Sequence, residues 1–258
     1  LASFLAWAVS WRAAFAIAAA AALITFSAIR ITVPKVPALP DSGFAAQFRF
    51  LRSLEPWLVL GAIGLGNGGF FAYYSYVNPV MEHVAAVPAS MMSVVITLAG
   101  AGMVLGNLFC AKISSSFSDE SLAAAGQGVL LLSLASVFFL AHWSPAAIAL
   151  TTLAAGCVFF ISGPEQVLMI RNAKEGQLLA ASLAQVSFNA GNAVGAWLGG
   201  LPIDAGKAAN WAAMPGFFLA LAGFGLLFVN WLIHRVREEE RTAGRIAALQ
   251  DQIQSKMP

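Results

Sequence analysis

The sequence predicts an all-α polytopic membrane protein with seven complete transmembrane helices and the end of another. Of its 258 residues, 59% are hydrophobic and only 10% are charged, and the mean hydropathy is +0.78. A typical soluble domain carries about 25% charged residues. A water-soluble fold of this length could not hide so much apolar surface, so an integral membrane protein is expected.

The apolar residues gather in segments that reach the roughly 20 residues a bilayer core requires. Residues 1–10 have the composition of a helix end. Because the chain starts at Leu1 without a signal-peptide pattern, we expect it to begin partway through a longer protein. Residues 13–33 form the first complete span. A polar connector over residues 34–55 follows, and residues 44–54 within it have the pattern of an amphipathic surface helix. Six further spans are predicted at residues 56–80, 89–111, 121–141, 145–170, 177–201 and 212–234, before a charged tail over residues 235–258.

The basic residues orient these spans. The connector, the loops at 112–120 and 171–176, and the tail carry, together with Arg30, twelve of the fourteen lysines and arginines. The opposite side has only Arg12 and Lys207. Because basic residues concentrate in cytoplasmic loops, the connector and the tail are predicted to be cytoplasmic.

One helix face of the span at 177–201 is polar. At 100° per residue its polar side chains fall within an arc of about 80°; they are Ser182, Gln185, Asn189 and Asn192. Beside this stripe a glycine recurs at every fourth position, at Gly191, Gly195 and Gly199. Such a ridge of glycines is typical of close helix packing, and the polar face indicates the wall of a solute pathway.

The span at 56–80 has a comparable face. Its polar and aromatic members are spaced by 4, 3 and 4 residues; they are Asn67, Phe71, Tyr74 and Asn78. A buried asparagine beside an aromatic ring suits a sugar or an apolar drug. Hydrogen bonding between neighbouring spans is the alternative for any one of these residues. For the face as a whole, a solute lining is favoured.

Glu165 is the acidic residue well inside a predicted span. An intramembrane acid usually faces a cavity, pairs with a base or takes up a proton. Glu165 follows Gly163-Pro164, which is predicted to break or kink the helix. Two interpretations remain open: proton coupling or substrate binding, and a hydrated position close to the cytoplasmic surface.

The sequence contains no catalytic set, so no enzyme activity is expected. Cys110 and Cys157 lie in separate apolar segments without metal-ligand or disulfide spacing, and they are expected to pack. Gly102 and Gly106 have helix-packing spacing. The three histidines fall at the ends of different spans. No cofactor, metal or nucleic-acid partner is indicated.

Several segments resemble a known family. They are SWRAAF at 10–15, FRFLRSLEPW at 48–57, GNGGFFAYYSYVNP at 66–79, GMVLGN at 102–107, NAK at 172–174 and SFNAGNAVGAWLGG at 187–200. Through them the chain resembles the second half of a major facilitator superfamily transporter, in the arabinose-efflux-permease-like subgroup of the drug/proton antiporters. Ala111-Lys112 stands where this family usually has Gly-Arg. Lys112 keeps the positive charge but lacks the several planar N–H donors of an arginine side chain.

The resemblance implies the C-terminal half of a twelve-helix fold in a bacterial inner membrane. Residues 1–33 would then hold the end of helix five and helix six, and residues 56–234 the C-terminal six-helix bundle. The implied activity is export of small solutes, sugars or drugs, by alternating access coupled to protons. A non-transporting sensor or binding protein, or an inactive truncated transporter, is the alternative. Substrate, coupling ion and oligomeric state stay open.

Overall fold

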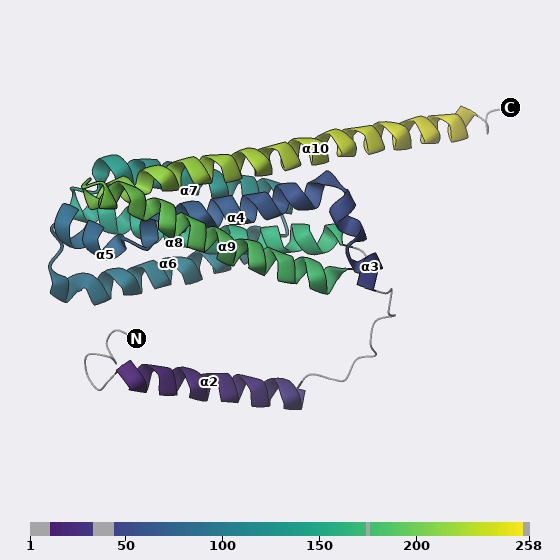
Figure 1. Ribbon diagram of the computed structural model, residues 1–258. Helices are drawn as coiled ribbons and strands as arrows, with labels where there is room; N and C mark the ends of the chain where they lie inside the picture. Colours follow the sequence, from purple (N-terminus) through teal and green to yellow (C-terminus); the bar gives the residue numbers. More distant parts are fainter. Residues whose placement is uncertain (1–10, 33–43, 174–175, 255–258) are drawn as a thin grey trace.

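The computed structural model describes residues 11–32, 44–173 and 176–254, and this part of the chain is helical without a strand. The long helices are α2 (Trp11–Thr32), α4 (Leu54–Tyr74), α6 (Met92–Ile113), α7 (Asp119–Leu140), α8 (Ser144–Asn172), α9 (Gln177–Asp204) and α10 (Ala213–Gln254). Figure 1 shows them as a bundle, with α2 apart and α10 extending beyond it. The all-α polytopic fold is therefore confirmed. The helix end predicted in residues 1–10 lies outside the described residues.

Five described helical segments are long and apolar enough to cross a membrane. They are Phe15–Thr32, Ala89–Ile113, Asp119–Leu140, Ser144–Asn172 and Ala209–Gly244. The other two predicted spans, α4 and α9, have 21 and 28 residues. Both helices pack in the bundle with the other spans.

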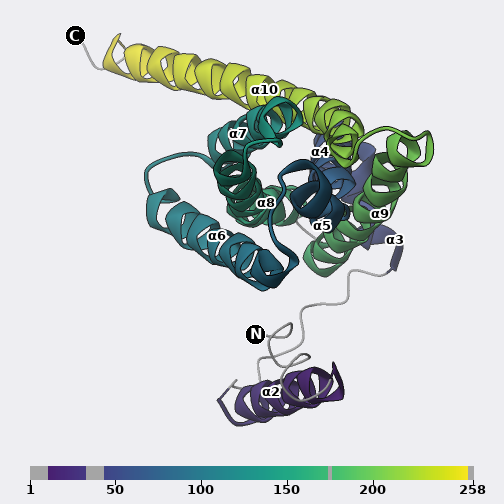
Figure 2. The same cartoon turned by 90° about the vertical axis from the view of Figure 1, so that its left-hand side faces the viewer.

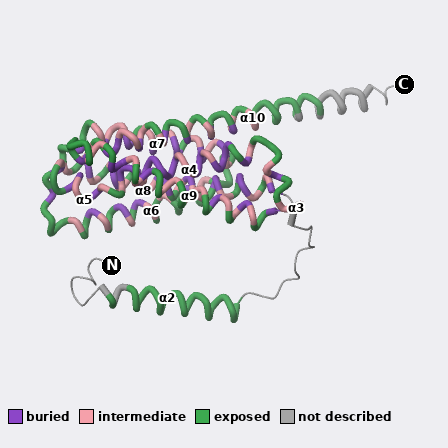
Figure 3. The backbone as a smooth tube through the Cα atoms, viewed as in Figure 1, coloured by how far each residue is buried: buried purple, intermediate pink, exposed green. Residues whose placement is uncertain are grey.

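The bundle is organised around α4 and α8. Helix α4 packs against α9, α10 and α8, whereas α6 and α7 both pack against α8 (Figure 2). Buried residues concentrate in this bundle, and α2 is exposed along its length from residue 15 (Figure 3). An apolar surface of this extent suits a hydrocarbon environment rather than water.

Glycines bring the backbones of α4 and α9 into contact. A Cβ added at Gly191, Gly195 or Gly199 would overlap the carbonyl oxygen of Gly64, Gly68 or Ala72, respectively. The packing role predicted for this ridge is thus confirmed. Gly102 and Gly106 of α6 likewise lie against the carbonyl oxygens of Thr152 and Gly156 on α8. The polar faces of α4 and α9 therefore lie beside a close contact between the two backbones.

Two predicted helices are divided in the structure. Helix α4 ends at Tyr74, and the chain continues through the short α5 (Val77–Pro79) and a π-helical turn at Val80–Val84. The Tyr76 hydroxyl beside this break donates to the Ala196 carbonyl of α9, over 3.0 Å. The predicted surface helix at 44–54 consists of α3 (Phe44–Gln47) and a 3-10 turn at Arg49–Arg52. In contrast, α10 continues from the membrane span into the charged tail as one helix.

Candidate functional site

A cavity of about 270 Å³ lies between α4, α8 and α9. It is lined by Ile63 and Asn67 of α4, by Val158, Phe159, Ser162, Glu165 and Gln166 of α8, and by Ala184, Gln185 and Phe188 of α9. The lining combines two aromatic rings with a carboxyl group, a hydroxyl and three amides. This mixture of apolar walls and few polar groups is typical of a small-molecule site, and the cavity volume lies just below the usual lower bound of about 300 Å³.

Glu165 is buried at this cavity, with 2% of its surface exposed. The interpretation that places its carboxyl in water near the membrane surface is therefore wrong. Gly163-Pro164 was predicted to break or kink the helix. The break is wrong, because α8 continues as an α-helix through Pro164 to Asn172, and the kink stays a prediction. Proline lacks an N–H, so it cannot donate the helical hydrogen bond to the Phe160 carbonyl. Helices α4, α6, α7 and α9 all pack against α8.

Asn67 faces Glu165 from α4. Its side chain lies against the Glu165 carboxyl and is 1% exposed. Its Nδ2 donates to the Ile63 carbonyl of the same helix over 2.8 Å. Two acceptors remain without a hydrogen-bond donor, Asn67 Oδ1 and Glu165 Oε1. Buried polar atoms without partners are costly, so a donor from a water, a proton or a ligand is expected between these two acceptors.

Only part of the predicted solute lining meets at this cavity. Asn67, Glu165 and Gln185 line it together. Asn189 lies on the exposed face of α9, where its Nδ2 donates to the Gln185 carbonyl over 2.8 Å. Asn192 is half-buried with Oδ1 unpartnered, away from the cavity lining. Asn78 is exposed in α5, beyond the break in α4, so it does not continue the α4 face as its spacing predicted.

Aromatic residues connect the cavity to the rest of α4. Phe188 lies edge-on to Phe71, with ring centroids 6.1 Å apart. Phe71 in turn is edge-on to Tyr74 at 6.2 Å, and Tyr74 stacks on Phe70 at 4.8 Å. The predicted Phe71 and Tyr74 thus form an aromatic wall beside the cavity rather than part of its lining.

Phe159 and Phe188 were missed as lining residues in the sequence. Phe188 follows Gln185 by three positions, so it lies near the polar stripe of α9 on the helix surface. That spacing could have identified it. Phe159 has no such signal, because α8 is apolar on most of its faces.

The arrangement of spanning helices and exposed apolar side chains defines this protein as a polytopic α-helical membrane protein. No family model matches the chain. It is 34% identical to the putative transporter AraJ of Escherichia coli (strain K12), over 89% of this chain and 58% of that protein. It is 25% identical to the uncharacterized MFS-type transporter YfhI of Bacillus subtilis (strain 168), over 87% and 56%. It is 26% identical to the purine ribonucleoside efflux pump NepI of Escherichia coli (strain K12), over 79% and 51%.

The chain is thus related over nearly its whole length to transporters of the major facilitator superfamily, as its motifs predicted. It spans little more than half the length of these relatives.

Proposed function

We propose that this chain forms part of a secondary transporter that exports small organic solutes, sugars or drugs, by alternating access coupled to protons. In this proposal residues 56–234 are its C-terminal six-helix bundle and residues 1–33 belong to its other half. The observation that carries the proposal is the pair of unpartnered acceptors, Asn67 Oδ1 and Glu165 Oε1, buried at one cavity inside a membrane bundle. The names of the related transporters support it.

The two unpartnered acceptors can receive hydrogen bonds in two ways. A proton on Glu165 turns its carboxyl into a donor, which can serve the Asn67 acceptor beside it. Without that proton the carboxylate and the amide oxygen both need donors from outside. A solute with hydroxyl or amino groups supplies them. Proton and solute then compete for the same acceptors, which is the thermodynamic requirement for exchanging one for the other.

The remaining lining suits a neutral or weakly polar solute. Gln185 offers both a donor and an acceptor, and the ring of Phe188 offers an apolar platform. Sugar and nucleoside rings carry both hydroxyl groups and an apolar face. Many drugs share these features, so the cavity fits either class.

Transport in proteoliposomes that contain the complete gene product tests the proposal. Glu165→Gln keeps the shape of the side chain and a donor for Asn67 but cannot release a proton. We expect this variant to bind solute yet lose proton movement driven by an outward solute gradient. Glu82→Gln is the matched control, because Glu82 is exposed. Solute-driven proton movement at the normal rate in Glu165→Gln would contradict the coupling role. Binding without any transport in the unaltered protein would favour a sensor instead.

A further inference from the structure

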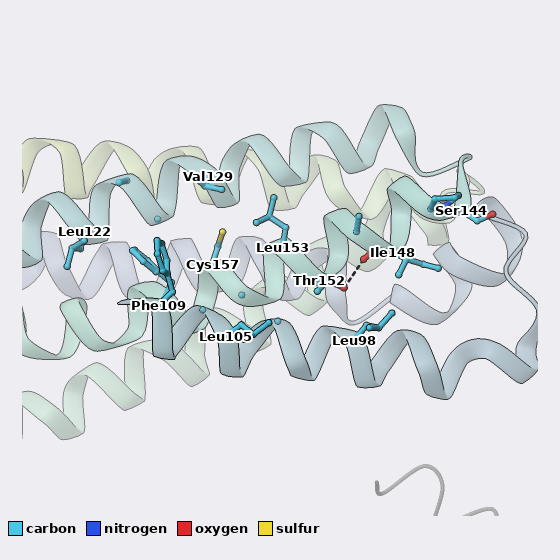
Figure 4. A pocket seen from close by; sticks show the side chains of 18 of the residues that line it. Leu98, Leu105, Phe109, Leu122, Val129, Ser144, Ile148, Thr152, Leu153 and Cys157 are labelled. Carbon is cyan, nitrogen blue, oxygen red and sulfur yellow. Dashed lines mark hydrogen bonds between the residues drawn. The ribbon is translucent and has the colours of Figure 1, made fainter. Parts of the chain in front are cut away.

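A second concavity lies on the other side of α8. Helices α6 and α7 are joined by only five residues, 114–118, yet within the described residues they make no extensive contact with each other. Both helices pack against α8, and a groove of about 1390 Å³ lies between them. Figure 4 shows Leu105 and Phe109 of α6 along one side and Val129 of α7 along the other. Antiparallel helices with a short connection usually pack together, so the groove stands where a direct contact between α6 and α7 would be expected.

The described lining of the groove offers little to a polar solute. Its three hydroxyls already have partners. Ser121 Oγ accepts from Trp231 Nε1 over 3.1 Å, Ser144 Oγ donates to the Ala85 carbonyl over 2.6 Å, and Thr152 Oγ1 donates to the Ile148 carbonyl over 2.9 Å. None of the buried unpartnered side-chain atoms of the described residues belongs to its lining. In this respect it is the opposite of the cavity at Glu165.

Its size and position also differ from those of a solute site. Small-molecule pockets usually enclose about 300–1,000 Å³. The groove is larger, and it extends from Met91 along α6 to Ile113 at the end of that helix. At about 1.5 Å per residue this length is near 33 Å, close to the thickness of the hydrocarbon core of a bilayer. All three lining helices are among the segments able to cross a membrane.

Charge distinguishes the two ends of the groove. Lys112 is exposed in the last turn of α6, next to the lining residue Ile113. The acidic side chains at this end, Asp119 and Glu120, face Arg171 instead. Lys112 therefore stands at the level of lipid headgroups, on the side that the distribution of basic residues predicts to be cytoplasmic. A lysine at this level attracts anionic lipids.

We propose that the groove between α6 and α7 binds the acyl chains of an anionic phospholipid, with its headgroup at Lys112. The bound chains replace the missing contact between α6 and α7 and pack against α8. This lipid site is separate from the solute cavity and does not depend on the proposed transport activity.

Native mass spectrometry of the complete gene product tests the site, with phosphatidylglycerol and phosphatidylethanolamine of identical acyl chains as probes. Ala125→Trp places an indole in the groove from an exposed lining position on α7, whereas Leu132→Trp adds the same bulk on the same helix outside the lining. We expect Ala125→Trp to lose the bound lipid and Leu132→Trp to keep it. Equal lipid retention by both variants overturns the proposal, as does an unaltered protein without bound lipid, in which other segments fill the groove.

A second variant tests the headgroup. Lys112→Gln should lower the preference for phosphatidylglycerol over phosphatidylethanolamine about fivefold, the effect of one basic residue near a membrane surface. Lys207→Gln, which removes a base from the opposite side, should leave it unchanged. Because Lys112 is exposed, this variant folds even where a groove-filling tryptophan does not. An unchanged preference in Lys112→Gln rules out the anionic headgroup site.

Discussion

Gly195 of α9 lies against the backbone carbonyl of Gly68 on α4, with no space for a side chain between them. The same relationship repeats one turn away on either side, at Gly191 with Gly64 and at Gly199 with Ala72. In a membrane, where lipid tails are as apolar as side chains, such backbone approach is a main source of helix association. The contact fixes α9, and therefore Gln185 and Phe188, against the helix that carries Asn67.

Gly195→Ala should therefore destabilise the bundle. The added methyl group would force α4 and α9 apart, and overpacking of this kind costs about 1–3 kcal/mol. Gly100→Ala is the control, because a Cβ at Gly100 meets nothing within 4 Å. Thermal unfolding in detergent measures both. We expect a lower midpoint for Gly195→Ala and an unchanged or slightly raised one for Gly100→Ala; equal midpoints would show that the helices can separate without cost.

The sequence predicted those features that depend on a single helix. The glycine spacing in α9 predicted a packing ridge, and the apolar segments predicted the helices. The burial of a side chain and the residues it contacts depend on neighbouring helices, and the sequence did not predict them. The buried state of Glu165 results from α4 and α9 covering α8, which no local pattern encodes. The position of Asn78 depends on a break at Ser75 and Tyr76. Pro79 favours this break, because its ring clashes with the Ser75 carbonyl four residues earlier and its nitrogen has no N–H to donate. The helical spacing of Asn67, Phe71, Tyr74 and Asn78 ignored that signal.

Asn67→Leu should weaken solute binding. It removes the acceptor Oδ1 beside Glu165 while keeping a side chain of similar size. The loss of one hydrogen bond corresponds to about 0.5–1.5 kcal/mol, or a fall in affinity of up to about tenfold. Asn78→Leu makes the same chemical change at the exposed asparagine beyond α4. Calorimetric titration with the transported solute should find weaker binding in Asn67→Leu alone. An equal loss in both variants would contradict a direct contact between Asn67 and the solute.

Phe188→Leu tests the aromatic platform of the cavity. Leucine keeps the apolar contacts of position 188 but removes the ring that lies edge-on to Phe71. An aromatic pair contributes about 0.5–1.5 kcal/mol beyond its buried area. We expect solutes with flat or ring-shaped apolar faces to lose several-fold in affinity and small linear solutes to lose little. Phe218→Leu, at an exposed position of α10, is the control. A uniform loss for all solutes would indicate a packing role for Phe188 rather than stacking.

The ion pair between Arg171 of α8 and Glu120 of α7 should matter far more for stability than the pair between Arg237 and Glu55. The Glu120 side chain is 1% exposed, its Oε2 has no partner, and His234 Nε2 lies 3.4 Å from its Oε1. The Arg237 side chain is 56% exposed. Arg171 is 47% exposed and Glu55 is 20% exposed, so the two pairs differ mainly in the burial of the carboxylate. Removing Arg171 leaves the buried Glu120 charge uncompensated, a loss that reaches about 3–5 kcal/mol for a fully buried pair, whereas exposed pairs contribute about 0–1 kcal/mol.

Thermal unfolding of Arg171→Gln and Arg237→Gln compares the two pairs directly. Arg171→Gln should unfold at a much lower temperature, and the Arg237→Gln midpoint should stay close to that of the unaltered protein. Adding Glu120→Gln to Arg171→Gln should recover most of the loss, because the buried charge is then gone together with its partner. If the double variant is as unstable as Arg171→Gln alone, the arginine stabilises the junction of α7, α8 and α10 through its packing rather than through the charge of Glu120.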